Sequence, residues 1–133
     1  MLRSVIILLA IADGLLHLAL NVVLFDGNFF GPLSFASPFP LPFNQLFVLN
    51  FVGYVVLAVA FWYAPRGLGR RRWLVDLVFL VYTVLSILGW LQIGRPNPQG
   101  LGFASKALEV ALIVALAVHA WRVIRPGRQT SSS

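Results

Sequence analysis

The stretch "RSVIILLAIADGLLHLALNVVLF" (residues 3–25) decides the fold. It is an apolar run of about 20 residues, the length that an α-helix needs to cross a hydrocarbon core of ~30 Å. Its first half is typical of a signal peptide, because Arg3 precedes an apolar core and the small residues Ala10 and Ala12. The run continues past Asp13, however, so we expect a retained transmembrane helix and no cleavage.

The composition of the whole chain indicates a membrane protein. Of its 133 residues, 59% are hydrophobic and 11% are charged, and the mean hydropathy is +0.88. A soluble domain carries about 25% charged residues, so most of this surface cannot face water. The absence of cysteine excludes disulfides, thiolate metal sites, Fe–S clusters and thiol nucleophiles. The length allows one domain, which we place at residues 1–125.

Four apolar runs are long enough to span a bilayer. They predict an all-α integral membrane protein, built as a four-transmembrane-helix up-down bundle. We expect the helices at about residues 4–25, 44–64, 73–93 and 103–124. A long outer loop at 26–43 joins the first two helices, and residues 126–133 are expected to form a disordered cytoplasmic tail.

The basic residues predict the orientation of this bundle. If the four helices alternate in direction, one side carries Arg3, Arg66, Arg70, Arg71, Arg72, Arg122, Arg125 and Arg128. The other side carries only Arg95 and Lys106. Basic residues are enriched on the cytoplasmic side of membrane proteins, so both termini should be cytoplasmic. This placement explains the net charge of +6 without nucleic acid as a partner.

Polar residues interrupt all four apolar runs at a similar depth. At 1.5 Å per residue, His17 lies roughly 21 Å from Arg3, and the same count from the arginines of the other helices reaches further polar residues. This predicted intramembrane polar layer contains Asp13, His17, Asn21, Asn50, Tyr54, Thr83, Ser86, Lys106 and Glu109. Such groups are costly in lipid, so we expect them to face the interior of the bundle.

Three interpretations of this layer are open. The first interpretation is an interhelical hydrogen-bond network that fixes which helices meet. The second is a site for protons, an ion or a small polar ligand. The third interpretation is a metal site built from Asp13, His17 and Glu109, a weak pattern without sulfur ligands. A haem held by both histidines is excluded, because His119 lies roughly 5 Å from the cytoplasmic end and His17 roughly 21 Å.

The fourth helix carries two faces that lipid alone does not explain. Ala107, Ala111 and Ala115 recur every four residues and form a seam that lets another helix approach closely. Glu109 points nearly the opposite way, about 200° around the helix from Ala107. Whichever face is turned inward, the other one suggests a protein neighbour. The outer loop adds candidates for interfacial burial or partner packing: Phe29, Phe30, Phe35 and Phe39.

Two segments resemble small, uncharacterised four-transmembrane-helix membrane proteins of bacteria and archaea. In "RRRWLVDLVFLVYTVLSILGW" (70–90) a basic turn precedes the third helix, and "GFASKALEVALIVALAV" (102–118) opens the fourth. The matching residues of a Gly–aromatic–x–x–Lys–x–x–Glu start are Gly102, Phe103, Lys106 and Glu109. The resemblance implies the four-helix fold and a location in a prokaryotic plasma (inner) membrane, and it implies no activity.

The usual enzyme motifs are absent: there is no Gly-rich phosphate loop, nucleophile elbow, HExxH or Cys–His pair. We therefore expect neither catalysis nor an intrinsic cofactor, although lipid, quinone or pigment could bind at a subunit interface. The leading hypothesis is an accessory subunit of a larger integral membrane complex, in particular an energy-transducing (electron-transport) one, in contact with membrane lipids and other integral membrane subunits. The alternative is a small homo-oligomeric transporter or channel for protons, ions or small solutes, with Asp13, His17 and Glu109 as its path. A membrane enzyme built on Asp13 and His17 is a further alternative.

Overall fold

The computed structural model describes residues 1–27 and 41–125, and within them it consists of helices without strands. Its four α-helices are α1 (Leu2–Phe25), α2 (Phe43–Gly67), α3 (Trp73–Gln92) and α4 (Leu101–Ile124), and two short 3₁₀ helices are η1 (Gly69–Arg72) and η2 (Pro98–Gly100). Each α-helix is long and apolar enough to cross a membrane, so the predicted all-α class with four such helices is confirmed. The largest difference in bounds is the end of α2, predicted near residue 64 and observed at Gly67.

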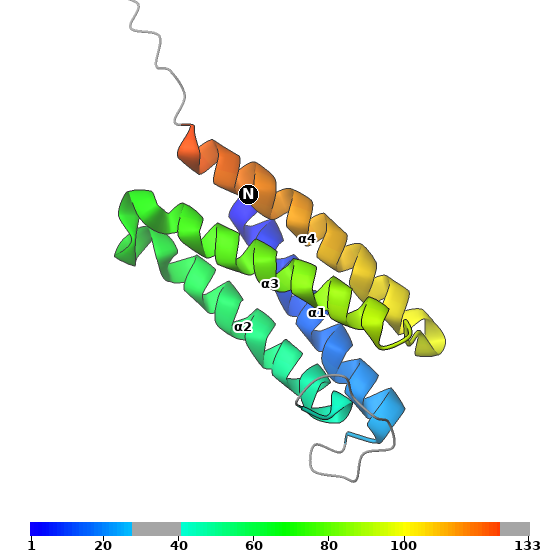
Figure 1. The fold of residues 1–133 in the computed structure, drawn as a ribbon. Coiled ribbons are helices and arrows are strands. Elements are labelled where there is room, and N and C mark those ends of the chain that lie inside the picture. Colours follow the sequence, from blue (N-terminus) through cyan, green and yellow to red (C-terminus); the bar gives the residue numbers. More distant parts are fainter. Residues whose placement is uncertain (28–40, 126–133) are drawn as a thin grey trace, which may run out of the picture.

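Consecutive helices run antiparallel and form one bundle (Figure 1). α1 packs against α2 and α4, and α3 packs against α4, whereas α2 and α3 contact each other less than these pairs do. The N-terminus, the α2–α3 connection and the end of α4 lie together at what we call the termini end. The end of α1, the start of α2 and the α3–α4 connection lie at the opposite end, which we call the loop end.

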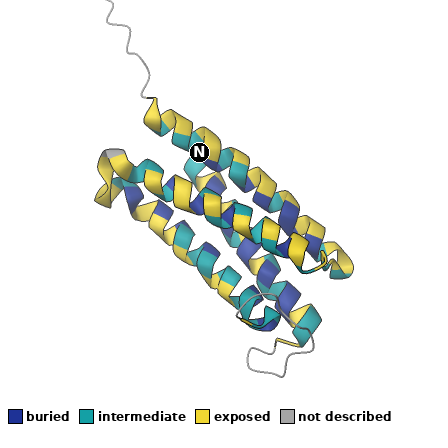
Figure 2. Cartoon of the chain, in the orientation of Figure 1, coloured by how far each residue is buried: buried dark blue, intermediate teal, exposed yellow. Residues whose placement is uncertain are grey.

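The apolar core fills the half of the bundle next to the termini end. All four helices contribute to it: Ile6, Ala10, Tyr54, Ala58, Phe61, Phe79, Leu112 and Leu116. Exposed residues run along the outer side of every helix (Figure 2), and many of them are large and apolar, among them Leu8, Val56, Val78 and Val114. An extended apolar surface of this kind is disfavoured in water and tolerated in lipid.

The α3–α4 connection is held by close contacts that need a glycine. Gly102, in the first turn of α4, is buried, and a Cβ at this position would collide with the Pro96 carbonyl oxygen. The Trp90 Nε1–H donates to the same oxygen at 3.0 Å, and the Phe103 N–H donates to Asn97 Oδ1 at 3.0 Å. These contacts hold the start of α4 against the end of α3 and so help to set the rotation of α4 about its axis.

Candidate functional site

A group of buried and half-buried polar side chains, called here the polar cluster, lies between the apolar core and the loop end. Its members are Asp13, His17, Asn50, Tyr54, Tyr82, Ser86, Ser105, Lys106 and Glu109. Glu109 is 0% exposed, and its Oε1 accepts hydrogen bonds from Ser86 Oγ at 2.6 Å and from the Tyr54 hydroxyl at 3.1 Å. Its Oε2 forms an ion pair with the Lys106 ammonium group. One carboxylate therefore joins α2, α3 and α4.

Helix α1 supplies an acid and an imidazole one turn apart. Asp13 Oδ1 accepts a hydrogen bond from Ser105 Oγ at 2.6 Å, which ties α1 to α4. His17 Nδ1 lies 3.0 Å from the main-chain oxygen of Asp13 and 3.5 Å from Asp13 Oδ2. His17 Nε2 lies 3.5 Å from Ser86 Oγ and 3.7 Å from Glu109 Oε1. The imidazole thus stands between the two buried carboxyl groups.

A second row of hydrogen bonds extends the cluster between α2 and α3. Asn50 Nδ2 donates to Ser86 Oγ at 2.9 Å, and the Tyr82 hydroxyl donates to Asn50 Oδ1 at 2.5 Å. Tyr82 reaches this amide because Gly53 leaves space for it: a Cβ at Gly53 would collide with the hydroxyl. Because Ser86 both accepts and donates, the network continues from α2 through α3 into α4.

Two members of the predicted layer donate their side-chain hydrogen bonds outside this network. Thr83 is buried, but its hydroxyl donates to the Phe79 carbonyl oxygen of its own helix at 2.9 Å. Asn21 lies one turn beyond His17 and donates to the Asn44 main-chain oxygen at 2.8 Å, which pins α1 to α2 near the loop end. The structure does bring together the other seven: Asp13, His17, Asn50, Tyr54, Ser86, Lys106 and Glu109.

Two members of the cluster, Ser105 and Tyr82, are absent from the predicted layer. Ser105 lies four residues before Glu109, and Tyr82 lies four residues before Ser86. Residues at this spacing share a helix face, so each could have been added as the neighbour of a predicted residue. Serine and tyrosine are common in membrane helices without such contacts, which makes the signal weak.

A separate buried pair lies near the termini end. His119 Nδ1 contacts Asp76 Oδ1 at 3.0 Å and Oδ2 at 3.1 Å, and this pair joins α3 to α4. Asp76 is 1% exposed, and the His119 ring packs against Phe61 with 5.0 Å between ring centroids. The two histidines therefore contact different carboxyl groups in different parts of the bundle, which agrees with the depth estimate that excluded a shared haem.

The three residues of the candidate metal site do meet. Asp13, His17 and Glu109 each offer one ligand atom, and these atoms lie within 4.8 Å of one another. A metal such as Zn²⁺ binds its ligands at about 2.0–2.2 Å, which requires neighbouring ligand atoms to approach to about 3.5 Å. Lys106 already pairs with Glu109 and supplies positive charge at this place. The geometry therefore favours hydrogen bonds over metal coordination.

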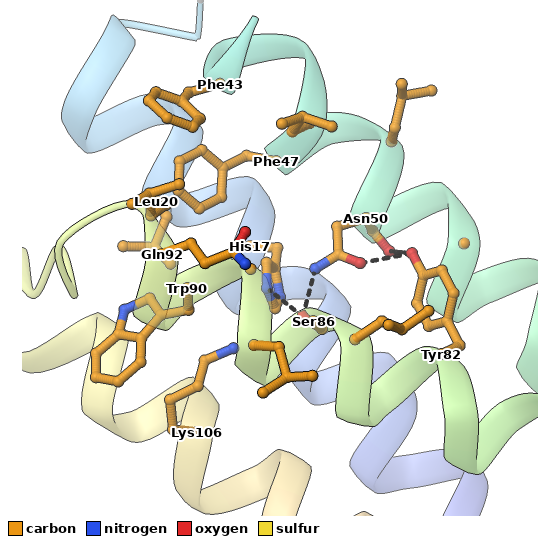
Figure 3. A pocket seen from close by; sticks show the side chains of 17 residues that line it. His17, Leu20, Phe43, Phe47, Asn50, Tyr82, Ser86, Trp90, Gln92 and Lys106 are labelled. Carbon is orange, nitrogen blue, oxygen red and sulfur yellow. Dashed lines mark hydrogen bonds between the residues drawn. The ribbon is translucent and has the colours of Figure 1, made fainter. Parts of the chain in front are cut away.

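A cavity of about 690 Å³ adjoins the polar cluster between α2 and α3 (Figure 3). It lies where these two helices contact each other little. Its walls are mainly apolar side chains, including Leu46, Phe47, Leu49, Leu85, Leu88 and Trp90. Five residues of the cluster also line it, and every helix contributes at least one: His17, Asn50, Tyr82, Ser86 and Lys106. The cavity is therefore apolar towards α2 and α3 and polar towards the centre of the bundle.

The rotation of α4 decides which of its two faces is turned inward. Glu109 is buried, and Ala107 and Ala111 are exposed, so the alanine seam lies on the outer surface. Ala115 is half-buried and packs against the apolar core. The loop candidates for partner packing, Phe29, Phe30, Phe35 and Phe39, lie outside the described residues.

The chain matches no protein-family model, no curated protein and no solved structure. Its resemblance to small four-helix prokaryotic membrane proteins therefore stays a prediction. Three features are left as the basis for a function: the polar cluster, the cavity beside it and the outer face of α4.

Proposed function

We propose that the chain is an integral protein of a prokaryotic plasma (inner) membrane, with both termini in the cytoplasm. Four apolar helices and an apolar outer surface support insertion into a bilayer. The orientation is supported by the basic residues at the termini end, among them Arg3, Arg66 and Arg122, against Arg95 at the loop end.

We further propose that it is an accessory subunit that packs against helices of a larger membrane complex. The observation that carries this proposal is the exposed face of α4 formed by Ala107 and Ala111. In lipid, helices associate through close packing of small residues, so an outward alanine seam favours a neighbouring helix. Glu109 makes its contacts inside the bundle and leaves this outer face apolar.

The polar cluster supports the same role. It joins all four helices through hydrogen bonds and an ion pair, and it fixes the direction in which the alanine seam faces outward. A bundle whose helices are joined in this way, with the alanine face of α4 exposed, suits a subunit that packs between helices of larger subunits. Membrane lipids would cover the remaining surface. The electron-transport setting stays a prediction.

Purification from native membranes in a mild detergent tests the accessory role. We expect the chain to co-purify with other membrane proteins at a fixed stoichiometry, and we expect Ala107→Leu combined with Ala111→Leu to abolish co-purification. The matched control is Ala12→Leu combined with Ala60→Leu, which adds the same side chains to exposed alanines of α1 and α2. Recovery of the unsubstituted chain as a stable, lone monomer contradicts the proposal.

A second candidate function is a homo-oligomeric proton or ion transporter, and one observation favours it. His17 lies 3.5 Å from Asp13 Oδ2 and 3.7 Å from Glu109 Oε1, so one imidazole contacts two buried acids. An imidazole can take up a proton on one nitrogen and release one from the other. Four helices enclose little water, so a symmetric assembly would have to complete the path. Unchanged proton flux in Asp13→Asn proteoliposomes, or no flux through the parent protein, removes this candidate.

A further inference from the structure

The cavity beside the polar cluster opens at the outer surface of the bundle. Leu49 and Leu85 line it and are also 43% and 60% exposed, so they form its rim. Leu46 and Phe47 line it on the α2 side. Its volume of about 690 Å³ lies within the range of about 300–1,000 Å³ that is usual for small-molecule sites. A lipid-soluble molecule can therefore enter sideways, between α2 and α3.

Two side chains that line the cavity carry hydrogen-bond donors without an acceptor among residues 1–27 and 41–125. The Lys106 side chain is nine-tenths buried, and its ammonium group has three hydrogens. Among the described residues this group makes one hydrogen bond, to Glu109. Gln92, an exposed residue at the end of α3, also lines the cavity, and its amide has no hydrogen-bond partner among the same residues. Figure 3 shows Gln92 and Lys106 extending into the space beside His17. An oxygen atom placed there can accept hydrogen bonds from both.

The charges next to the cavity select a neutral ligand. Lys106 is already paired with Glu109, and Asp13 is a second buried acid, 3.5 Å from His17. The charge of Lys106 is thus already balanced by Glu109, so a carboxylate or phosphate headgroup would gain little from the lysine and would lie close to the Glu109 carboxylate. Carbonyl oxygens accept hydrogen bonds without carrying a charge. The Trp90 ring lines the same space, with the Lys106 ammonium group over it at 5.9 Å from the ring centroid, and an aromatic ring can pack against another ring.

We propose that this cavity binds a quinone, that is, a neutral ring with carbonyl oxygens and an apolar tail. Lys106 and Gln92 both donate hydrogen bonds to one carbonyl oxygen, and Trp90 flanks the ring. The tail leaves the cavity between Leu49 and Leu85. This inference assigns binding without electron transfer, and it does not rest on the accessory role, because every residue of the site belongs to this chain.

Trp90 permits a direct binding assay, because quinones quench the fluorescence of a tryptophan that they contact. The chain's other three tryptophans, Trp62, Trp73 and Trp121, lie towards the termini end and do not line the cavity. A variant with these three replaced by Phe reports on the cavity alone. We expect a benzoquinone with a decyl tail to quench it saturably, with one site per chain. In the control, which keeps only Trp121, quenching should rise linearly with the quinone in the micelle.

Two substitutions in the single-tryptophan chain test the proposed contacts. Gln92→Leu removes a donor that the described fold does not use, and Leu85→Phe narrows the mouth of the cavity. Each should raise the Kd about tenfold. The matched controls, Gln45→Leu and Leu77→Phe, replace residues that do not line the cavity and should leave the Kd unchanged.

Three results would overturn the quinone site. The first is linear quenching of Trp90, equal to that of Trp121, because it would show partitioning into the micelle alone. The second is the same Kd in both cavity variants and in their two controls. The third is displacement of the quinone by an equimolar amount of decylbenzene or oleate, because the cavity would then recognise an apolar tail or an anion and no carbonyl head.

Discussion

Replacing Glu109 by leucine removes the group on which three helices meet. The change leaves the Lys106 ammonium group buried without its ion pair, and the hydroxyls of Ser86 and Tyr54 without their acceptor. Breaking a buried ion pair from one side costs about 3–5 kcal/mol. The two hydroxyls that lose their acceptor add about 1 kcal/mol together, since a hydrogen bond between membrane helices contributes about 0.6 kcal/mol on average. We therefore expect Glu109→Leu to lower the free energy of unfolding by about 4–6 kcal/mol.

Unfolding of the purified chain by SDS in mixed micelles, followed by circular dichroism, measures this change. Lys106→Met should lower the free energy of unfolding less than Glu109→Leu does, because Glu109 keeps the hydrogen bonds from Ser86 and Tyr54. The double variant should be at least about 2 kcal/mol more stable than Glu109→Leu, because it leaves no buried charge without a partner. If the free energy of unfolding of Glu109→Leu lies within about 0.5 kcal/mol of that of the parent chain, the polar cluster does not stabilise the bundle.

Two smaller changes test local packing and topology. A methyl group at Gly53 should displace the Tyr82 hydroxyl, so Gly53→Ala is expected to cost about 1–3 kcal/mol in the same titration. Gly67→Ala, whose Cβ meets nothing within 4 Å, should stay within about 0.5 kcal/mol of the parent. Because the chain has no cysteine, single cysteines report topology. An impermeant maleimide added to intact cells should label Asn97→Cys and not Ser4→Cys, and the reverse pattern contradicts the proposed orientation.

The four helices could be predicted because the length and apolarity needed to span a bilayer are properties of each segment alone. The meeting of Asp13, Ser86 and Glu109 in one part of the bundle could also be anticipated. A helix rises 1.5 Å per residue, so counting from the arginines at its end gives an approximate depth. Depth, however, says nothing about the direction in which a side chain points around the helix.

The sequence does not predict which face of each helix points towards the interior of the bundle. Each helix is apolar nearly all round, so periodicity does not show whether Glu109 or the alanine seam faces inward. Thr83 donates outside the predicted network because a threonine can donate to its own helix, and Asn21 does so because a main-chain oxygen is available on α2. The cavity depends on the separation of α2 and α3, which is a property of the packed bundle and not of either segment.

The most direct test of the accessory role is photo-crosslinking from the outer face of α4 in native membranes. A benzophenone-bearing amino acid at Ala111 should give one adduct of fixed mass with a different membrane protein. The same amino acid at Ala60, an exposed alanine of α2, should not give this adduct. No adduct from Ala111, or an adduct only with a second copy of this chain, contradicts the account.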